Sequence, residues 1–287
     1  MLRNLPAVSR YRFCSEVELG TGVLMPYLEQ GDPSGIPLVL VHGVGDSQRI
    51  FESLLDYLPV SIHAFAPTMR GHGDASQPPM GYRSSDYAAD LAAFMDALGI
   101  EAAIVAGGSS GGLVAQRFAL DFPDRLLGLA MLGSPLTFRD KPSAQTLGEA
   151  TLPGSADPID PGFVRGLLEG MLSRPMPEAL MDSAVQESVK VPAFVWRETL
   201  RGILEDDFSD ELSRVAVPAR IIWGDGDALL PRADQETLSR LIPQARLVVY
   251  PGAGHLFYWE EPSRVGADLA TFADEIARTS RLPKGEG

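Results

Sequence analysis

At 287 residues, the chain is long for one compact domain and short for two, so one domain with an insertion fits best. Its hydrophobic fraction of 45% and its charged fraction of 22% are those of a globular protein. The formal net charge of −14 argues against a phosphate-neutralising surface for nucleic acid and against docking on anionic membranes. We therefore expect neither nucleic acid nor a membrane as a partner.

The sequence also indicates a cellular compartment. No apolar run approaches the roughly 20 residues that span a bilayer, and the first fifteen residues hold no apolar core of signal-peptide length. The single cysteine, Cys14, allows no intramolecular disulfide and fits a reducing compartment. We expect a cytoplasmic protein.

The first half of the chain alternates short apolar runs with helix-like segments. Two stretches near its start, 11–19 and 23–29, are typical of an antiparallel edge hairpin. Apolar runs that stop at glycine or proline predict buried strands over 37–42, 62–66, 102–107 and 126–133. Helical spacing and end signals, such as Ser47 as an N-cap, predict helices over 47–57, 84–98 and 110–122.

The same alternation resumes after residue 210. Strands are predicted over 220–223 and 246–250, and helices over 232–241 and 263–278. Strands and helices that alternate at this spacing form parallel βαβ units. The sequence therefore predicts an α/β fold, with a mostly parallel sheet that helices cover on both faces.

Between residues 137 and 210 the strand signals vanish and helical signals replace them. Asp160-Pro161 has the cap-then-proline form of a helix start, and Pro177 and Pro192 open two further helical segments. A helical block inserted at a strand's carboxyl end would lie over the place where open α/β sheets bind ligands. We predict a core formed by 1–136 and 211–287, with 137–210 as an inserted helical cap.

The segment Ala106-Gly-Gly-Ser-Ser-Gly-Gly112 lies between a predicted strand and a predicted helix, where a Gly-x-Ser-x-Gly nucleophile elbow belongs. A turn this tight leaves no room for side chains two residues before and two after the serine, and it exposes the serine hydroxyl. With Ser109 as the nucleophile, the strand ends directly before Gly107, so we favour that register. The register with Ser110 as the nucleophile also satisfies the motif and stays open.

A serine hydroxyl is a weak nucleophile and needs a base. In this topology the chain order is nucleophile, acid, histidine, and His255 is the one histidine that follows Ser109. It lies in a glycine-rich loop directly after the predicted last strand. His42 and His72, beside glycines in turns, are expected to orient loops by hydrogen bonds, and His63 is expected to be an ordinary strand-edge residue.

The third member must be a carboxylate after a late strand, and the segment Ile221-Ile-Trp-Gly-Asp-Gly-Asp227 offers two. The loop has a Gly-x-x-Asp form that favours Asp227, with Asp225 as a turn carboxylate. Asp140, after the strand that precedes the predicted cap, is a further alternative. The acid would hold the imidazole in one tautomer and stabilise the imidazolium that forms during attack.

An oxyanion hole is also required, because it stabilises the charge that develops on the reacting carbonyl oxygen. One donor would be the backbone N–H of Ser110, at the start of the helix. The other would be the backbone N–H of Val44, in the loop after His42-Gly43. Both are backbone groups, so side-chain identity says little about them.

Five motifs follow one another along the chain: Val41-His-Gly43, Arg70-Gly-His-Gly73, the Ser109 elbow, Trp223-Gly-Asp-Gly-Asp227 and Gly252-Ala-Gly-His255. Together, from about residue 38 to the end, they resemble the α/β-hydrolase superfamily. The resemblance implies an eight-stranded, mostly parallel sheet with an inserted helical cap. It also implies an acyl-enzyme mechanism that uses neither a cofactor nor a metal.

The sequence departs from the family pattern at two positions. Many relatives carry an acidic residue before Arg-Gly-x-Gly, where this chain has Thr68, and we expect this to alter loop packing. Many carry histidine before the nucleophile, where this chain has Gly108, and we expect this to widen the pocket. The serine nucleophile argues against the haloalkane dehalogenase and epoxide hydrolase branches, which use aspartate.

These features predict a serine hydrolase that cleaves a carboxylic ester or lactone of a small to medium, largely apolar substrate. Cap residues Phe138, Met171 and Trp196 are candidates for the lining of its pocket. Three alternatives remain: hydrolysis of a carbon–carbon bond in a diketone-like substrate, cofactor-free haloperoxidase or perhydrolase activity, and a ligand-binding receptor with little turnover. Fold-level resemblance names no substrate, and a homo-oligomer is compatible with the sequence.

Overall fold

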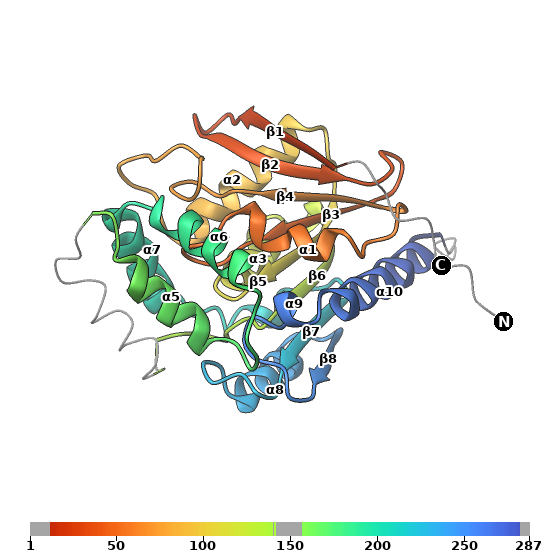
Figure 1. Cartoon of the computed structure of the whole chain (residues 1–287). Coiled ribbons are helices and arrows are strands. Elements are labelled where there is room, and N and C mark those ends of the chain that lie inside the picture. Colours follow the sequence, from red (N-terminus) through yellow and green to blue (C-terminus); the bar gives the residue numbers. More distant parts are fainter. Residues whose placement is uncertain (1–11, 140, 142–156, 282–287) are drawn as a thin grey trace.

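The structure, a computed structural model, describes residues 12–139, 141 and 157–281. This part of the chain forms an eight-stranded sheet in the order β1-β2-β4-β3-β5-β6-β7-β8 (Figure 1). Its strands are β1 (Arg12–Glu18), β2 (Leu24–Gln30), β3 (Ile36–Val41), β4 (Ile62–Pro67), β5 (Ala103–Gly108), β6 (Leu126–Leu132), β7 (Ala219–Gly224) and β8 (Ala245–Tyr250).

Strand pairing divides the sheet into an antiparallel edge and a parallel remainder. β1 pairs antiparallel with β2, and β2 with β4, whereas every other neighbouring pair is parallel. The central strands β3 and β5 are almost wholly buried, which explains their continuous apolar sequences. The mostly parallel α/β sheet and its N-terminal hairpin are confirmed.

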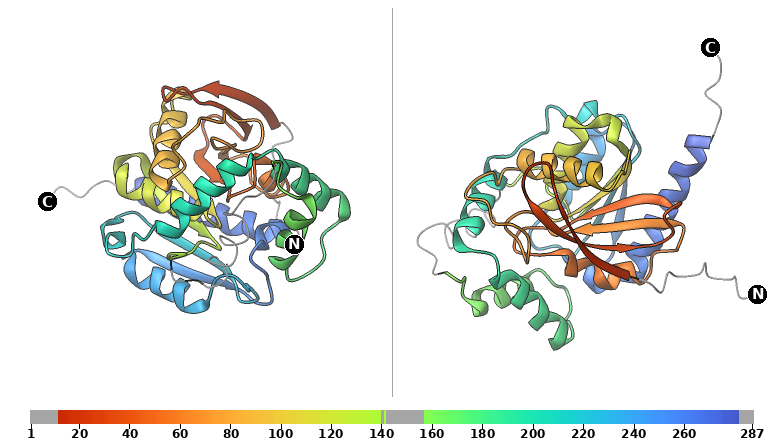
Figure 2. Two further views of the ribbon diagram at one scale, coloured as in Figure 1. Left: turned by 90° about the vertical axis from the view of Figure 1, so that its left-hand side faces the viewer. Right: turned by 90° about the horizontal axis from the view of Figure 1, so that it is seen from above.

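Helices cover both faces of the sheet. α1 and α10 pack together on one face, and α2 and α3 pack together on the other (Figures 1 and 2). The helices of this core are α1 (Glu52–Leu55), α2 (Ser84–Ala97), α3 (Gly111–Asp121), α8 (Arg232–Leu241), α9 (Phe257–Glu260) and α10 (Pro262–Arg281).

One predicted helix is shorter and tighter than expected. Over 47–57 the chain forms a turn of 3-10 helix, η1 (Gln48–Phe51), followed by the four residues of α1. Ser47 caps this turn as predicted, because its hydroxyl accepts a hydrogen bond from the N–H of Arg49 at 3.3 Å. The 3-10 turn is a common form at a helix start, and sequence spacing alone does not distinguish it from an α-helical turn.

Between β6 and β7 the described chain forms helices α5 (Pro161–Gly170), α6 (Glu178–Val189) and α7 (Ala193–Glu205). Asp160 caps α5 by accepting from the N–H of Phe163 at 2.8 Å, and Pro177 and Pro192 directly precede α6 and α7. The three helices gather beyond one end of the sheet, at the left of Figure 1. We refer to α5, α6 and α7 as the cap helices; the boundaries 137 and 210 stay a prediction.

Candidate active site

The turn from β5 to α3 has the strained geometry that a nucleophile elbow requires. Ser109 has a φ of 51°, in the left-handed region that side chains disfavour. A Cβ added at Gly107 would lie 2.3 Å from the carbonyl oxygen of Gly111, and one added at Gly111 would lie 2.5 Å from that of His42. Glycines at these two positions are therefore required for the turn to close.

Three side chains on different loops meet at this turn. The Nε2 atom of His255 lies 2.8 Å from the Oγ atom of Ser109, and its Nδ1 atom lies 2.8 Å from an Oδ atom of Asp227. A carboxylate accepts only, so Nδ1 carries the proton and Nε2 accepts from the serine hydroxyl. The side chains of His255 and Asp227 are fully buried, so the pair is shielded from water.

The carboxylate of Asp227 is fixed at both oxygens. Its second oxygen accepts from the backbone N–H groups of Leu229 and Leu230, at 2.8 and 3.0 Å. Asp225 instead accepts from the N–H of Gly252 and holds the turn between the two loops. The structure thus brings Asp227, and not Asp225, to His255, whereas Asp140 lies outside the described residues.

The other three histidines hold local structure. His42 donates from Nδ1 to the carbonyl of Gly43 at 2.8 Å and accepts at Nε2 from the N–H of Met69 at 2.9 Å. His72 donates to the carbonyl of Arg70, and His63 lies 2.8 Å from a carboxylate oxygen of Glu29. Burial lowers the pKa of His42 to about 3 and that of His72 to about 4, so both rings are neutral near pH 7.

The two predicted oxyanion donors lie beside Ser109. The backbone N–H of Ser110 makes no hydrogen bond to any described residue. The backbone N–H of Val44 donates to the hydroxyl of Ser110 at 2.9 Å. The Ser110 side chain therefore contacts residues 43–45, which we call the oxyanion loop after their predicted role, and Ser109 is the serine whose hydroxyl reaches His255.

A largely apolar cavity of about 290 Å³ opens at Ser109. Phe138 and Met171 line it, as predicted, together with side chains of α5 and α7. Trp196, predicted to line the pocket, does not. It is 1% exposed and packs against the oxyanion loop, where a Cβ added at Gly45 would lie 2.3 Å from its ring.

One ionisable side chain lines this cavity among the described residues, and it is not among the residues predicted from the sequence. Asp46 follows the oxyanion loop, and its carboxyl makes no hydrogen bond or ion pair with the described part of the chain. Burial raises the pKa of Asp46 to about 8, so the carboxyl is protonated at neutral pH. Its position directly after His-Gly-x-Gly is the sequence signal that would have found it.

Gly108 does not widen the pocket. A Cβ at this position would lie 3.3 Å from the ring of Tyr258, which fills the space beside the elbow. The Tyr258 hydroxyl is buried and has no hydrogen-bond partner among the described residues. Burial raises the pKa of Tyr258 well above its usual range, with Asp46 and Asp227 adding to the effect.

A second residue that sequence reasoning missed ties the histidine loop to the cap. Glu260 accepts from the N–H of Gly254, the residue before His255, at 2.8 Å. Its other oxygen accepts from Ser173 and Arg174, which follow α5. Glu260 stands five residues after His255, and nothing in the local pattern distinguishes it from a surface carboxylate.

The described residues hold no group of three or more histidine, cysteine, aspartate or glutamate side chains arranged to bind a metal. None of the helices in the described ranges is long and apolar enough to cross a membrane. The cellular location and the oligomeric state stay predictions.

Residues 38–268 match the model of the Alpha/beta hydrolase family. A non-heme haloperoxidase of Rhodococcus erythropolis is 29% identical over 84% of this chain and 93% of its own length. A pimeloyl-(acyl-carrier protein) methyl ester esterase of Aromatoleum aromaticum is 28% identical, over 84% of this chain and 98% of its own.

Among solved structures, the N-acyl homoserine lactone degrading enzyme Est816 aligns with a TM-score of 0.76 and 28% sequence identity, covering 90% of this chain and all of that one. The eight-stranded sheet and the elbow geometry agree with the family match, which spans most of the sequence. The chain therefore belongs to the alpha/beta hydrolase family and is an enzyme of that family.

Proposed function

We propose that the protein hydrolyses a carboxylic ester or lactone through an acyl-enzyme on Ser109. The observation that carries the proposal is the unbroken hydrogen-bonded series from Ser109 through His255 to Asp227, with Ser109 in the lining of an apolar cavity. Each link is 2.8 Å long, so the base is within reach of the hydroxyl proton before substrate arrives.

In the first half-reaction, the Oγ atom of Ser109 forms a bond to the ester carbon and its proton moves to Nε2 of His255. The carbonyl π electrons move to oxygen, where the oxyanion hole at Ser110 and Val44 stabilises the charge. Asp227 stabilises the imidazolium without taking its proton. His255 then returns the proton to the leaving alkoxide, which departs as an alcohol or, for a lactone, stays tethered to the acyl group.

In the second half-reaction, water takes the place of the alcohol. His255 removes a proton from the water, whose oxygen bonds to the acyl carbon, and the acid leaves as Ser109 regains its proton. Nothing in this cycle requires a co-reactant other than water.

The cavity supports a substrate of small to medium size. Its volume of about 290 Å³ is at the lower end of ligand pockets, and its walls are mostly apolar. Protonated Asp46 is the exception, because it offers a hydrogen-bond donor within an otherwise apolar lining. The methyl ester esterase and the lactone degrading enzyme among the relatives support the same substrate classes.

A second candidate activity, cofactor-free haloperoxidase or perhydrolase chemistry, is favoured by the similarity to the Rhodococcus haloperoxidase. In that case hydrogen peroxide replaces water in the second half-reaction and the acyl group leaves as a peracid. The same acyl-enzyme precedes both outcomes, so we propose this activity as a side reaction.

The proposal is tested by measuring turnover of short-chain p-nitrophenyl esters, small lactones and a diketone with the wild type and with Ser109→Ala. We expect ester or lactone cleavage by the wild type and a loss of about 10⁴-fold or more in kcat in the variant. Cleavage of the diketone alone would replace the proposal with a carbon–carbon hydrolase. Tight binding of these compounds without turnover would replace it with a receptor.

A further inference from the structure

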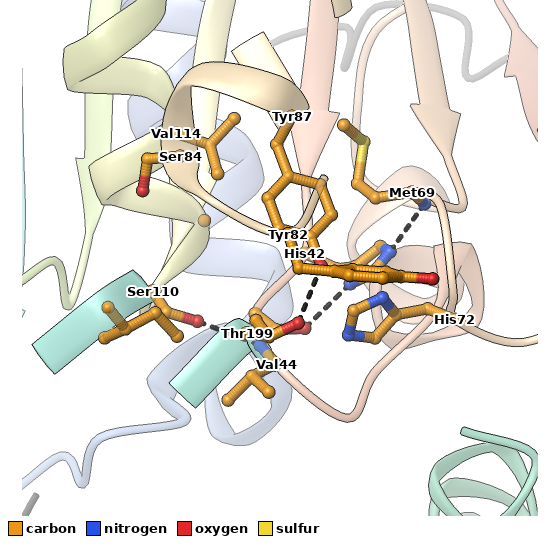
Figure 3. A pocket seen from close by; sticks show the side chains of 13 residues that line it. His42, Val44, Met69, His72, Tyr82, Ser84, Tyr87, Ser110, Val114 and Thr199 are labelled. Atoms are coloured by element: carbon orange, nitrogen blue, oxygen red, sulfur yellow. Dashed lines mark hydrogen bonds between the residues drawn. The ribbon is translucent and has the colours of Figure 1, made fainter. Parts of the chain in front are cut away.

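The hydroxyl of Ser110 occupies the oxyanion hole that backbone groups were expected to form alone. It accepts the hydrogen bond of the Val44 N–H at 2.9 Å, so its oxygen lies in the direction in which that amide donates. Ser110 is 5% exposed, and Figure 3 shows its side chain pointing toward Val44. Gly43 lies against both serines, since a Cβ added there would be 3.2 Å from Cβ of Ser109 and 3.4 Å from Oγ of Ser110.

The proton of this hydroxyl has no acceptor in the described part of the chain. A serine hydroxyl offers one donor and two acceptor lone pairs, and one lone pair of Ser110 is used by Val44. Ser110 stands at the start of α3, but its side chain does not cap that helix. A buried donor without an acceptor is costly, and a reacting carbonyl oxygen that gains negative charge would satisfy it.

Ser110 lines two cavities. One is the cavity at Ser109, and the other is a space of about 20 Å³ that His42, His72 and Tyr87 help to enclose (Figure 3). The smaller space holds about one water molecule and is too small for a substrate group. The O–H bond of Ser110 can therefore point in two directions, toward the reacting carbonyl or into the smaller space.

We infer that the Ser110 hydroxyl, and not the Val44 N–H directly, is the second donor of the oxyanion hole, because that N–H already donates to the hydroxyl. As Ser109 attacks and its proton moves to His255, the carbonyl oxygen accepts hydrogen bonds from the Ser110 backbone N–H and from the Ser110 hydroxyl. Val44 supports that hydroxyl from behind, because a donor that itself accepts a hydrogen bond is polarised and donates more strongly. No proton leaves Ser110 in this step. The inference rests on the proposed acyl-enzyme function of Ser109.

Three substitutions at position 110 distinguish the effect of the hydroxyl group from the effect of side-chain size. Ser110→Ala removes the group, Ser110→Cys keeps its approximate size but donates weakly, and Ser110→Thr keeps the hydroxyl. With a p-nitrophenyl ester that the wild type cleaves, we expect Ala and Cys to lower kcat by about 10- to 100-fold, less than a full oxyanion donor because the backbone groups remain. KM should change little, and Thr should recover most of the lost rate.

A transition-state analogue distinguishes this role from a purely structural one. A trifluoromethyl ketone forms an oxyanion adduct on a serine nucleophile, so its affinity should fall by the same factor as kcat/KM in the Ala and Cys variants. Affinity for the product acid and the unfolding temperature should stay near those of the wild type. If Thr does not fold, Ala and Cys with this inhibitor still decide the question.

An unchanged or higher kcat in Ser110→Ala would overturn the inference, because the hydroxyl would then withdraw into the smaller space or obstruct Val44. Equal losses in ketone affinity and product affinity would also overturn it, since they indicate a distorted pocket. Failure of the proposed function is seen separately, in a wild-type enzyme that cleaves no ester and forms no adduct on Ser109.

Discussion

The two walls of the active-site cavity are built in different ways. On the core wall, polar groups are held in place by hydrogen bonds: Asp227 by two backbone amides, His255 by Asp227, and Val44 by Ser110. On the cap wall, the lining is apolar and comes from α5, the residue that follows it and α7, with the side chains of Leu167, Met171, Leu200, Ile203 and Leu204. The core wall is therefore suited to stabilise charge, and the cap wall to select substrates by their shape.

Because of this difference, we expect the core wall to determine the rate of the reaction and the cap wall to determine which substrate is selected. Groups that stabilise charge must be fixed before the substrate arrives, because reorganising dipoles during the reaction would cost the energy that they supply. Apolar side chains contribute by area and shape, so their exchange alters which substrate fits and leaves the charge stabilisation in place. Substitutions on the two walls should therefore differ in kind as well as in size.

The largest effect is expected at the core wall, from Asp227→Asn. The amide no longer holds the imidazole in the required tautomer, so kcat should fall by about 10⁴-fold while KM changes little. The matched change Asp225→Asn, two residues away, should keep most of the activity because the Asp225 carboxylate accepts from the N–H of Gly252 and makes no hydrogen bond to His255. Measuring kcat of both variants with p-nitrophenyl esters over a range of pH checks these expectations. A larger loss in Asp225→Asn than in Asp227→Asn would make Asp225 the acid that supports His255.

An intermediate effect is expected where the two walls meet, at Asp46. Its folded-state pKa of about 8 lies above the ordinary aspartate value, so between these values the unfolded chain releases a proton that the folded chain keeps. The stability of the wild type should therefore fall as pH rises from about 4 to about 8 and then level off.

Asp46→Asn removes the group that titrates, because an amide does not ionise. Any change in stability that comes from packing of the new side chain is the same at every pH. Relative to the wild type, the variant should gain about 4 kcal/mol in unfolding free energy between pH 5 and pH 8. Urea unfolding of both proteins at these two pH values measures the gain. A constant difference would mean that the Asp46 carboxyl is ionised in the folded protein at neutral pH.

The smallest effect is expected at the cap wall. Leu204→Ala enlarges the cavity and should shift the preferred acyl chain by one or two methylenes, changing relative kcat/KM by about tenfold per methylene. Leu180→Ala makes the same change on α6, where the side chain is 43% exposed and does not line this cavity, and it should leave the preference unchanged. Equal shifts in both variants would point to a general loosening of the cap.

The geometry predicted from sequence agrees with the structure where it depends on a short turn or on the order of the strands. The elbow depends on glycines at fixed distances from Ser109, and the steric reason for Gly107 and Gly111 is the contact that the structure contains. The position of His255 follows from the order of the strands, which the alternation of apolar runs already indicates.

Prediction failed where the outcome depends on how elements pack. The spacing of apolar residues in α7 indicates that Trp196 is buried, but not whether its ring faces the cavity or the oxyanion loop at Gly45. In the same way, Gly108 suggested an open space, and Tyr258 from a segment 150 residues later fills it. Contacts of this kind require the rotation of each helix, which the sequence pattern leaves free.

The role of Ser109 as the nucleophile of a serine hydrolase is tested most directly by treating the wild-type enzyme with a fluorophosphonate probe and mapping the adduct by peptide mass spectrometry. We expect one adduct per chain on Ser109, formed only weakly when Asp227 is replaced by asparagine. An adduct on Ser110 would contradict the register of the elbow, and the absence of any adduct in folded protein would contradict the proposed mechanism.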